Sequence, residues 1–248
     1  RNKTKAVVAV EQSLAKVTNR LVAVGHQVRD DLLEAGIGTL TQYVVVPPGL
    51  TLPTGPPKTQ ARHLLNLPPS RPVIAFIGQL TSIKCPDRFA QIVHEVSTHR
   101  PDAHFVVAGD GDQQQSLYAA TRSLPVTMLG WRDDIETLLA ASDAVLLTSD
   151  NEGTPLSLIQ AAMAGLPVVA SDVGSVRDVV LDGETGWLAP PTPDALSHAV
   201  LDLLANPEEG IRRGRLGNSR AKAMYSLERL VRDHVDLYLD HVGQARLG

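Results

Sequence analysis

The chain has 248 residues, of which 43% are hydrophobic and 20% are charged, and its net charge is −4. This is the composition of a globular protein with one large or two small domains. It lacks the dense Lys/Arg run of a nucleic-acid-binding protein and any apolar run near the roughly 20 residues of a membrane span.

The single cysteine, Cys85, excludes an intramolecular disulfide and a cysteine-rich metal site. It fits a reducing compartment, so we expect a cytoplasmic protein. The eight histidines lack the H-E-x-x-H spacing of a zinc site, so we expect no metal. The sequence opens within a helical pattern, at an Arg, so we expect a fragment, a processed product or a trimmed chain.

The first 69 residues predict short elements and a linker. We expect helices over 6–17 and 27–33, and strands over 20–24 and 44–46. Residues 47–57 are rich in Pro and Gly and read as a linker by composition. A short helix is expected over 59–65.

From Pro72 onward, strand and helix patterns alternate regularly. The expected strands are 73–77, 105–108, 126–129, 144–147, 167–170 and 186–189, and the expected helices are 86–96, 113–122, 134–141, 155–164 and 176–180. Such alternation favours βαβ units, in which helices cover both faces of a parallel sheet. We therefore predict an α/β fold with a doubly wound, Rossmann-like sheet. The tail is predicted to be helical over 194–204, 208–224 and 227–241.

The helix after residue 154 has unusual faces. Thr154 is expected at its N-cap and Pro155 at its first position, and Gly165 is expected to end it. Apolar residues cover most of its surface, including Leu156, which predicts burial on most sides. Ser157 and Gln160, three residues apart, form a narrow polar stripe.

Glu152 lies just ahead of this helix. An acid, the unpaired amides of a first helical turn and a polar stripe together favour a polar, anionic ligand. The alternative is structural: Glu152 caps the helix and Gln160 pairs with a backbone carbonyl.

In a doubly wound sheet the ligand lies beyond the carboxyl ends of the strands. Five polar, Gly-containing loops are predicted there, and we expect them to meet in one crevice: 78–84, 109–112, 130–133, 149–154 and 171–174. Lys84 can bind a phosphate, or it can be a solvated surface lysine. Trp131 can stack on a base or fill a packing gap, and Arg132 can hydrogen-bond a base. Neither a P-loop nor a complete G-x-G-x-x-G is present.

Taken together, these loops resemble the carboxyl-terminal domain of retaining glycosyltransferase family 4, which has the GT-B fold. The motifs that carry the resemblance are Gly78-x-Leu-x-x-x-Lys84, Gly109-Asp-Gly111, Leu129-Gly-Trp-Arg-Asp-Asp134, Asp143-Ala-Val-Leu-Leu147, the stretch from Glu152 to Val169, Gly174, Asp178-Val-Val180 and Asp182-Gly-Glu-Thr-Gly-Trp-Leu188. They keep the family's order along nearly the whole chain.

The resemblance implies a site for a nucleotide-diphosphate-sugar donor that needs no metal. It places Lys84 on the diphosphate and Glu152, as the catalytic residue, on the donor sugar. Gln79 and Gln160 stand where the family has an Arg and a second acid, so we expect weaker donor binding than in a typical member. Cys85 replaces a Gly. The implied donor-binding residues are Gly78, Gln79, Lys84, Trp131, Arg132, Gly153, Thr154, Pro155, Leu156, Ser157 and Gln160.

The resemblance also implies a domain plan. Residues 1–46 are expected to be a remnant of the amino-terminal domain, 47–69 a linker, 70–225 the nucleotide-sugar-binding domain, and 226–248 a C-terminal helix that packs back on the amino-terminal part. The expected partners are the sugar donor, a carbohydrate or other hydroxyl acceptor and the missing amino-terminal domain, with a peripheral membrane contact and no nucleic acid. Two alternatives stay open: a nucleotide-sugar 2-epimerase and a non-catalytic scaffold.

Overall fold

The computed structural model describes residues 2–245, including the side chains of 5–240. Arg1 and residues 246–248, the outer ends of the predicted 1–46 and 226–248 segments, lie outside the described residues. The chain forms two compact units, one of residues 1–51 and 223–248 and the other of residues 52–222. We describe each unit by itself.

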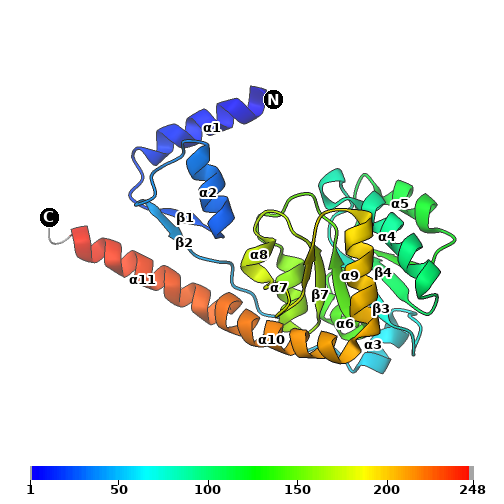
Figure 1. The fold of residues 1–248 in the computed structure, drawn as a ribbon. Coiled ribbons are helices and arrows are strands. Elements are labelled where there is room, and N and C mark those ends of the chain that lie inside the picture. Colours follow the sequence, from blue (N-terminus) through cyan, green and yellow to red (C-terminus); the bar gives the residue numbers. More distant parts are fainter. Residues whose placement is uncertain (1, 246–248) are drawn as a thin grey trace. The chain divides into compact units, whose positions relative to one another are not determined.

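The larger unit contains a six-stranded sheet in which all neighbouring strands are parallel (Figure 1). Its spatial order is β5-β4-β3-β6-β7-β8. The strands are β3 (Val73–Ile77), β4 (His104–Ala108), β5 (Val126–Gly130), β6 (Ala144–Leu147), β7 (Val168–Ser171) and β8 (Trp187–Ala189). Each strand begins within two residues of its predicted start. The predicted α/β, doubly wound fold is confirmed.

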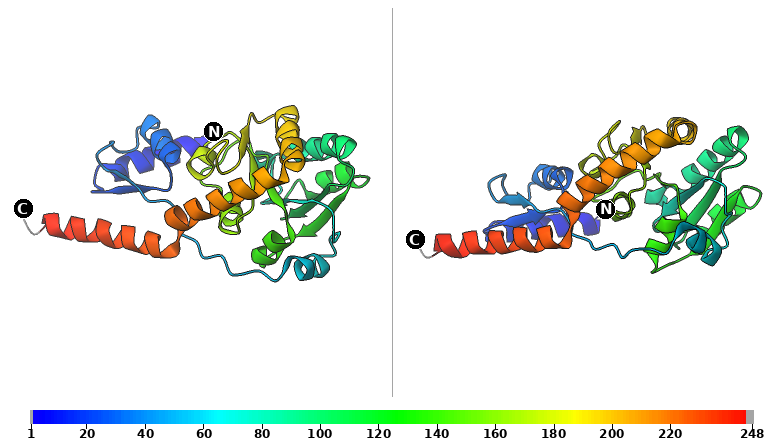
Figure 2. Two further views of the ribbon diagram at one scale, coloured as in Figure 1. Left: turned by 60° about the horizontal axis from the view of Figure 1, so that its bottom comes forward. Right: turned by 90° about the horizontal axis from the view of Figure 1, so that it is seen from below.

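Helices connect the strands and cover both faces of this sheet (Figures 1 and 2). They are α3 (Lys58–Leu64), η1 (Ser82–Lys84), α4 (Pro86–His99), α5 (Gln114–Thr121), α6 (Ile135–Ala141), α7 (Leu156–Met163), α8 (Val176–Val179), α9 (Pro193–Ala205) and α10 (Pro207–Tyr225). The last of these begins in the larger unit and ends in the smaller one. The predicted linker over 47–69 therefore includes an ordered helix, α3.

The main core lies between the sheet and helices α4 and α9. Alternate strand residues such as Ile74 and Phe76 face this core, because successive side chains of a strand point to opposite faces. The rings of Phe76, Phe89 and Phe105 pack edge to face, with centroids 5.2 and 5.9 Å apart. The intervening residues, such as Ala75, are also buried, beneath the helices of the other face. Burial on both faces explains the continuous apolar runs in the sequence.

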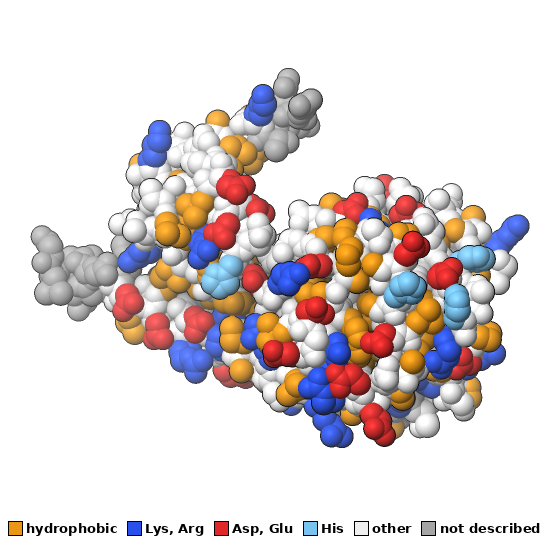
Figure 3. Space-filling view, viewed as in Figure 1, with side chains coloured by type: hydrophobic (Ala, Val, Ile, Leu, Met, Phe, Trp, Pro, Cys, Tyr) orange, Lys and Arg blue, Asp and Glu red, His pale blue; other side chains and the backbone are white. Residues whose placement is uncertain are grey.

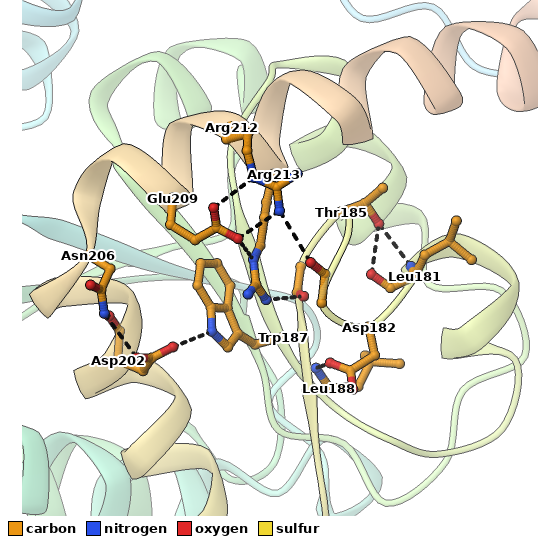
Figure 4. Close-up of polar contacts among 12 residues, drawn as sticks. Leu181, Asp182, Thr185, Trp187, Leu188, Asp202, Asn206, Glu209, Arg212 and Arg213 are labelled. Atoms are coloured by element: carbon orange, nitrogen blue, oxygen red, sulfur yellow. Dashed lines mark hydrogen bonds and ion pairs between the residues drawn. The ribbon is translucent and has the colours of Figure 1, made fainter.

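A polar cluster attaches the start of α10 to the sheet edge (Figure 4). The guanidinium of Arg213 stacks on the Trp187 ring, 3.8 Å from its centroid, and donates to the Gly186 carbonyl at 2.9 Å. Hydrogen bonds from Arg212 and then Arg213 lower the pKa of Glu209 to about 2. This contact fixes the loop before β8 by both stacking and charge.

The smaller unit contains two parallel strands, β1 (Leu21–Ala23) and β2 (Tyr43–Val45), and three helices, α1 (Asn2–Ala15), α2 (His26–Glu34) and α11 (Leu227–Ala245). Buried Arg229 of α11 donates to the carbonyls of Pro47 and Pro48, at 2.6 and 2.9 Å. The C-terminal helix thus contacts the segment after β2. That this unit is a remnant of a larger domain stays a prediction.

None of the helices in the described part of the chain combines the length and apolarity needed to cross a lipid bilayer.

Candidate functional site

The strand order reverses between β3 and β6. From β3 the chain proceeds outward through β4 and β5, and it then returns to the other side of β3 to form β6, β7 and β8. In open α/β sheets, ligands bind beyond the carboxyl ends of the strands at such a switch point. The loops that follow β3 and β6 therefore mark the candidate site.

An ion pair joins these two loops. Lys84, which follows β3, places its Nζ 2.5 Å from Oε1 of Glu152, which follows β6. The Glu152 side chain is only 7% exposed, and that of Lys84 is 23% exposed. The buried Ser149 hydroxyl donates to the same carboxylate oxygen at 2.5 Å. The carboxylate therefore has one charged and one neutral donor and little contact with water.

Hydrogen bonds fix the backbone on both sides of this pair. The Thr148 hydroxyl donates to the Lys84 carbonyl at 2.8 Å, and the Asp150 amide donates to the Ile83 carbonyl at 2.9 Å. Arg88 of α4 donates to the Thr148 carbonyl and to Asp150 Oδ1, both at 2.6 Å. The Arg88 hydrogen bond is also the main reason that the pKa of Asp150 lies below its usual value. The relative placement of Lys84 and Glu152 is thus built into the two loops.

The loop after β7 packs directly on Glu152. The Ser175 amide donates to the Glu152 carbonyl at 2.9 Å. At Gly174, φ is +49° and an added Cβ would lie 2.2 Å from that same carbonyl oxygen. Only glycine allows so close an approach of the two backbones. Gly174 belongs to the family motif, and its position beside Glu152 gives it a physical role.

Helix α7 begins one residue later than predicted, at Leu156. Pro155, rather than the predicted Thr154, occupies the N-cap position. Leu156 is 48% exposed, which contradicts its predicted burial. A first-turn residue has no preceding turn to pack against, so apolar periodicity overestimates its burial.

The alternative structural roles of Glu152 and Gln160 are both wrong. Glu152 bonds to Lys84 and Ser149 rather than capping α7. The Gln160 carboxamide, half-buried on α7, makes no hydrogen bond to any other group in residues 2–245. The half-buried Ser157 lies one turn before it on the helix, as the predicted stripe requires. Gly153 and Thr154 connect Glu152 to this helix.

A second group of predicted residues surrounds a separate cavity of about 200 Å³. Gly78, Gln79, Trp131 and Arg132 all line it, together with residues of the loop after β4. At Gly109, φ is +147° and an added Cβ would lie 1.8 Å from the Gly78 carbonyl oxygen. Both glycines line the cavity, and no side chain can fit between their two backbones.

Trp131 and Arg132 differ in how freely they can meet a ligand. The Trp131 side chain is 68% exposed, which disfavours the packing role and leaves a ring face for stacking. Arg132 donates twice to Asp134, with both hydrogen bonds at 2.7 Å. These bonds are the largest cause of the raised pKa of Arg132 and the lowered pKa of Asp134. A base can therefore stack on Trp131 more readily than it can bond to Arg132.

The five predicted loops thus form two neighbouring groups rather than one uniform crevice. Gly78 connects them, because an added Cβ there would lie 3.9 Å from the Lys84 Cδ and Cε atoms. The sequence analysis missed Ser149 and Arg88. The spacing Ser149-x-x-Glu152 is that of a capping box, but no helix begins at Ser149 and the two side chains bond to each other instead. Nothing local indicates Arg88, whose partners lie some 60 residues further along the chain.

Cys85 stands in a left-handed conformation, with φ 50° and ψ 59°, between η1 and α4. This conformation suits the glycine that the resemblance implies at this position, since a Cβ is strained there. Burial, followed by the neighbouring Asp150, raises the pKa of the Cys85 thiol to about 11. The thiol is therefore protonated near neutral pH. Within the described residues, no three His, Cys, Asp or Glu side chains come together in a cluster able to hold a metal ion.

Comparisons with known proteins identify the family. The family model "Glycosyl transferases group 1" matches residues 71–206, more than half of the chain. A D-inositol 3-phosphate glycosyltransferase of Segniliparus rotundus is 32% identical over 243 residues, which cover 88% of this chain and 54% of that protein. An Escherichia coli UDP-Gal:alpha-D-GlcNAc-diphosphoundecaprenol alpha-1,3-galactosyltransferase is 29% identical over 185 residues, 70% of this chain and 48% of that one. The chain spans about half the length of the curated relatives it matches.

Solved structures share the fold. Sucrose-phosphate synthase from Thermosynechococcus elongatus superposes with a TM-score of 0.83 at 23% identity, over 97% of this chain and 62% of that one. Anabaena Alr3699/HepE in complex with UDP and glucose superposes with a TM-score of 0.81 at 20% identity, over 92% of this chain and 67% of that one. At these identities the likeness supports the GT-B arrangement alone.

Proposed function

Because this chain belongs to the group 1 glycosyl transferase family, we propose that it carries the donor site of a retaining glycosyltransferase. The reaction moves a sugar from a nucleotide-diphosphate-sugar to an acceptor hydroxyl. The relatives' names support this class of reaction, since the Escherichia coli protein is named for a UDP-galactose donor and a Mycobacterium tuberculosis one for GDP-mannose.

The observation that carries the proposal is the Lys84–Glu152 ion pair across the switch point of the sheet. A buried carboxylate beside a lysine is costly to maintain for stability alone. The pair brings together, at one point, a cation suited to a diphosphate and an acid suited to sugar hydroxyls. This is the combination that a sugar diphosphate requires.

Donor binding then exchanges one partner of Lys84 for another. A diphosphate oxygen takes the place of the Glu152 carboxylate at the Lys84 ammonium. The released carboxylate accepts hydrogen bonds from the sugar hydroxyls while it keeps the one from Ser149. Two buried hydroxyls in the adjoining loops, those of Thr81 and Ser175, have no partner among the described residues. A bound ligand or water would satisfy them.

The transfer step needs stabilisation of the charge that develops on the departing diphosphate. Lys84 and the amides of the first turn of α7, at Leu156 and Ser157, supply it without a metal, because the first amides of a helix have no partner within it. The bond between the anomeric carbon and the diphosphate oxygen breaks, and the acceptor hydroxyl oxygen bonds to that carbon from the same face while its proton passes to the departing diphosphate oxygen. Glu152 holds the sugar during this exchange.

The base of the nucleotide binds beside the second group of residues. Trp131 stacks on it at the mouth of the 200 Å³ cavity, with Gln79 and Gly78 alongside. Gln160, whose carboxamide is free, takes the ribose hydroxyls. The acceptor, and any peripheral membrane contact, would fall mainly to parts of a full-length protein beyond this chain. We place this reaction in the cytoplasm, in line with the single reduced cysteine.

Isothermal titration calorimetry on the whole chain tests the donor site. UDP, GDP and ADP and their sugars are titrated with and without EDTA. We expect at least one nucleotide to bind with one-to-one stoichiometry and unchanged affinity in EDTA, and Lys84→Met to weaken it. Lys222→Met removes an exposed lysine and serves as the matched control. If no nucleotide binds, the scaffold alternative replaces the proposal.

A further inference from the structure

A cavity of the larger unit lies at the amino ends of the strands, opposite the proposed donor site. It has a volume of about 670 Å³, within the roughly 300–1,000 Å³ of small-molecule sites. Pro72, Asp143 and Pro167 line it, and each directly precedes one of the neighbouring strands β3, β6 and β7. Nothing in the proposed transfer reaction uses this edge of the sheet.

The cavity is strongly cationic in a chain whose net charge is −4. Five basic residues and one acidic residue line it. Figure 3 shows Lys and Arg side chains along this lower edge of the larger unit, interspersed with acidic ones. Arg71 and Arg215 are exposed and form no ion pair within the described part of the chain. Two of the charges are therefore available to an anion.

The remaining cations are held in place around the cavity. Arg62, whose side chain is 6% exposed, donates to Asp143 at 2.6 Å and to the Pro69 carbonyl at 2.7 Å. Lys58 pairs with the same carboxylate. Arg100 pairs with Asp102 at 2.9 Å. One acid is thus shared by two cations, which leaves a positive excess on a rigid wall.

The other walls are apolar. Leu166, Leu203 and Leu204 line the cavity together with prolines of the strand-preceding loops, and Ile211 of α10 lies at the rim with 53% of its surface exposed. Apolar walls with a few convergent charged groups are the usual composition of a small-molecule site. An exposed isoleucine beside two arginines without ion pairs among the described residues favours a ligand that has both an apolar and an anionic part.

We propose that this cavity binds a small anionic amphiphile, with a phosphate or carboxylate head at Arg71 and Arg215 and a hydrocarbon body against Leu166 and Ile211. The ligand is a free molecule rather than a lipid in a bilayer, because the site lies between α3, α10 and the strand ends of one unit. The proposal does not depend on glycosyl transfer.

Calorimetry on the 248-residue chain tests the site with octyl phosphate below its micellar concentration. We expect saturable one-to-one binding, with no binding of octanol or octyltrimethylammonium. Arg71→Glu and Arg215→Glu should each weaken binding at least about tenfold, since each removes a charge-assisted contact. Arg122→Glu makes the same charge change at an exposed arginine outside the cavity and should bind like the parent.

A third variant and a vesicle experiment keep the test decisive. Ile211→Asp alters the apolar wall at an exposed position, so this variant should fold but no longer bind octyl phosphate. Vesicles containing phosphatidic acid should not co-sediment with the chain. Absent octyl phosphate binding, equal weakening by Arg122→Glu, or binding to vesicles alone would each overturn the proposal.

Discussion

The two partners of the buried ion pair should differ in what their removal costs. Lys84→Met leaves the Glu152 carboxylate, which is 7% exposed, with the Ser149 hydroxyl, at 2.5 Å, as its one side-chain partner among the described residues. Removing one partner of a buried pair costs about 3–5 kcal/mol, and we expect about 3 because that hydroxyl remains. Glu152→Gln leaves a lysine that is 23% exposed, whose flexible stem can reach water. Its cost should be about 1 kcal/mol.

Thermal unfolding measures this asymmetry. For a chain of this size the two costs correspond to decreases in Tm of roughly 6–12 °C and 2–4 °C. The double variant gives the coupling energy by a mutant cycle. Equal losses for the two single variants, or a larger loss for Glu152→Gln, would refute the placement of the pair.

The same two variants should separate in nucleotide binding. Lys84→Met removes the cation and should weaken binding of a nucleoside diphosphate by at least about tenfold. Glu152→Gln removes the competitor for that cation, so it should bind the diphosphate at least as tightly as the parent does. Weaker diphosphate binding in Glu152→Gln would show that the carboxylate is not displaced by the donor.

Three further predictions address other parts of the larger unit. Gly109→Ala should lower the free energy of unfolding by more than about 3 kcal/mol, because the new Cβ would meet the Gly78 carbonyl. Gly183→Ala should lower it by about 1–2 kcal/mol in denaturant unfolding, because Gly183 has a positive φ but open space around it. Trp131→Ala should leave Tm unchanged, since the ring is exposed, but weaken nucleotide binding by about 1–3 kcal/mol in calorimetry. Glu209→Gln should lower Tm at neutral pH. The difference from the parent should disappear as the pH falls from about 4.5 towards 2, because a depressed carboxyl pKa contributes stability only above that range.

The order and type of the elements follow from the sequence because burial imposes them. A strand such as β3 is covered on both faces, so it reads as an uninterrupted apolar run between polar loops. The two ends of α7 differ in how well the sequence predicts them. Gly165 has φ +77° and ends the helix as predicted, since only the left-handed conformation permits that turn. The start lacks an equally specific signal, and the N-cap is Pro155 rather than the predicted Thr154.

The site is less predictable because its contacts join distant segments. The motifs place Lys84 and Glu152 after two different strands, and the sheet topology alone makes those strands neighbours. That these residues bond to each other is not encoded in either loop. It depends on Arg88 and Thr148, which fix the loops from outside the motifs. Residue types indicate which chemistry is possible, and the long-range packing decides which groups meet.

The two glutamines give the ion pair its particular importance here. Where the resemblance implies an arginine at position 79 and an acid at position 160, this chain has neutral amides, so in the proposed donor site Lys84 is the main cation available to a diphosphate. That cation is already paired in the structure. Donor affinity in that site then depends on the difference between two free energies, that of the Lys84–diphosphate contact and that of the Lys84–Glu152 contact which it replaces. Because this difference is small compared with either contact, a change at either partner alters the affinity. Restoring the cation with Gln79→Arg, at an exposed position beside Gly78, should therefore strengthen diphosphate binding more than any change at Lys84 could.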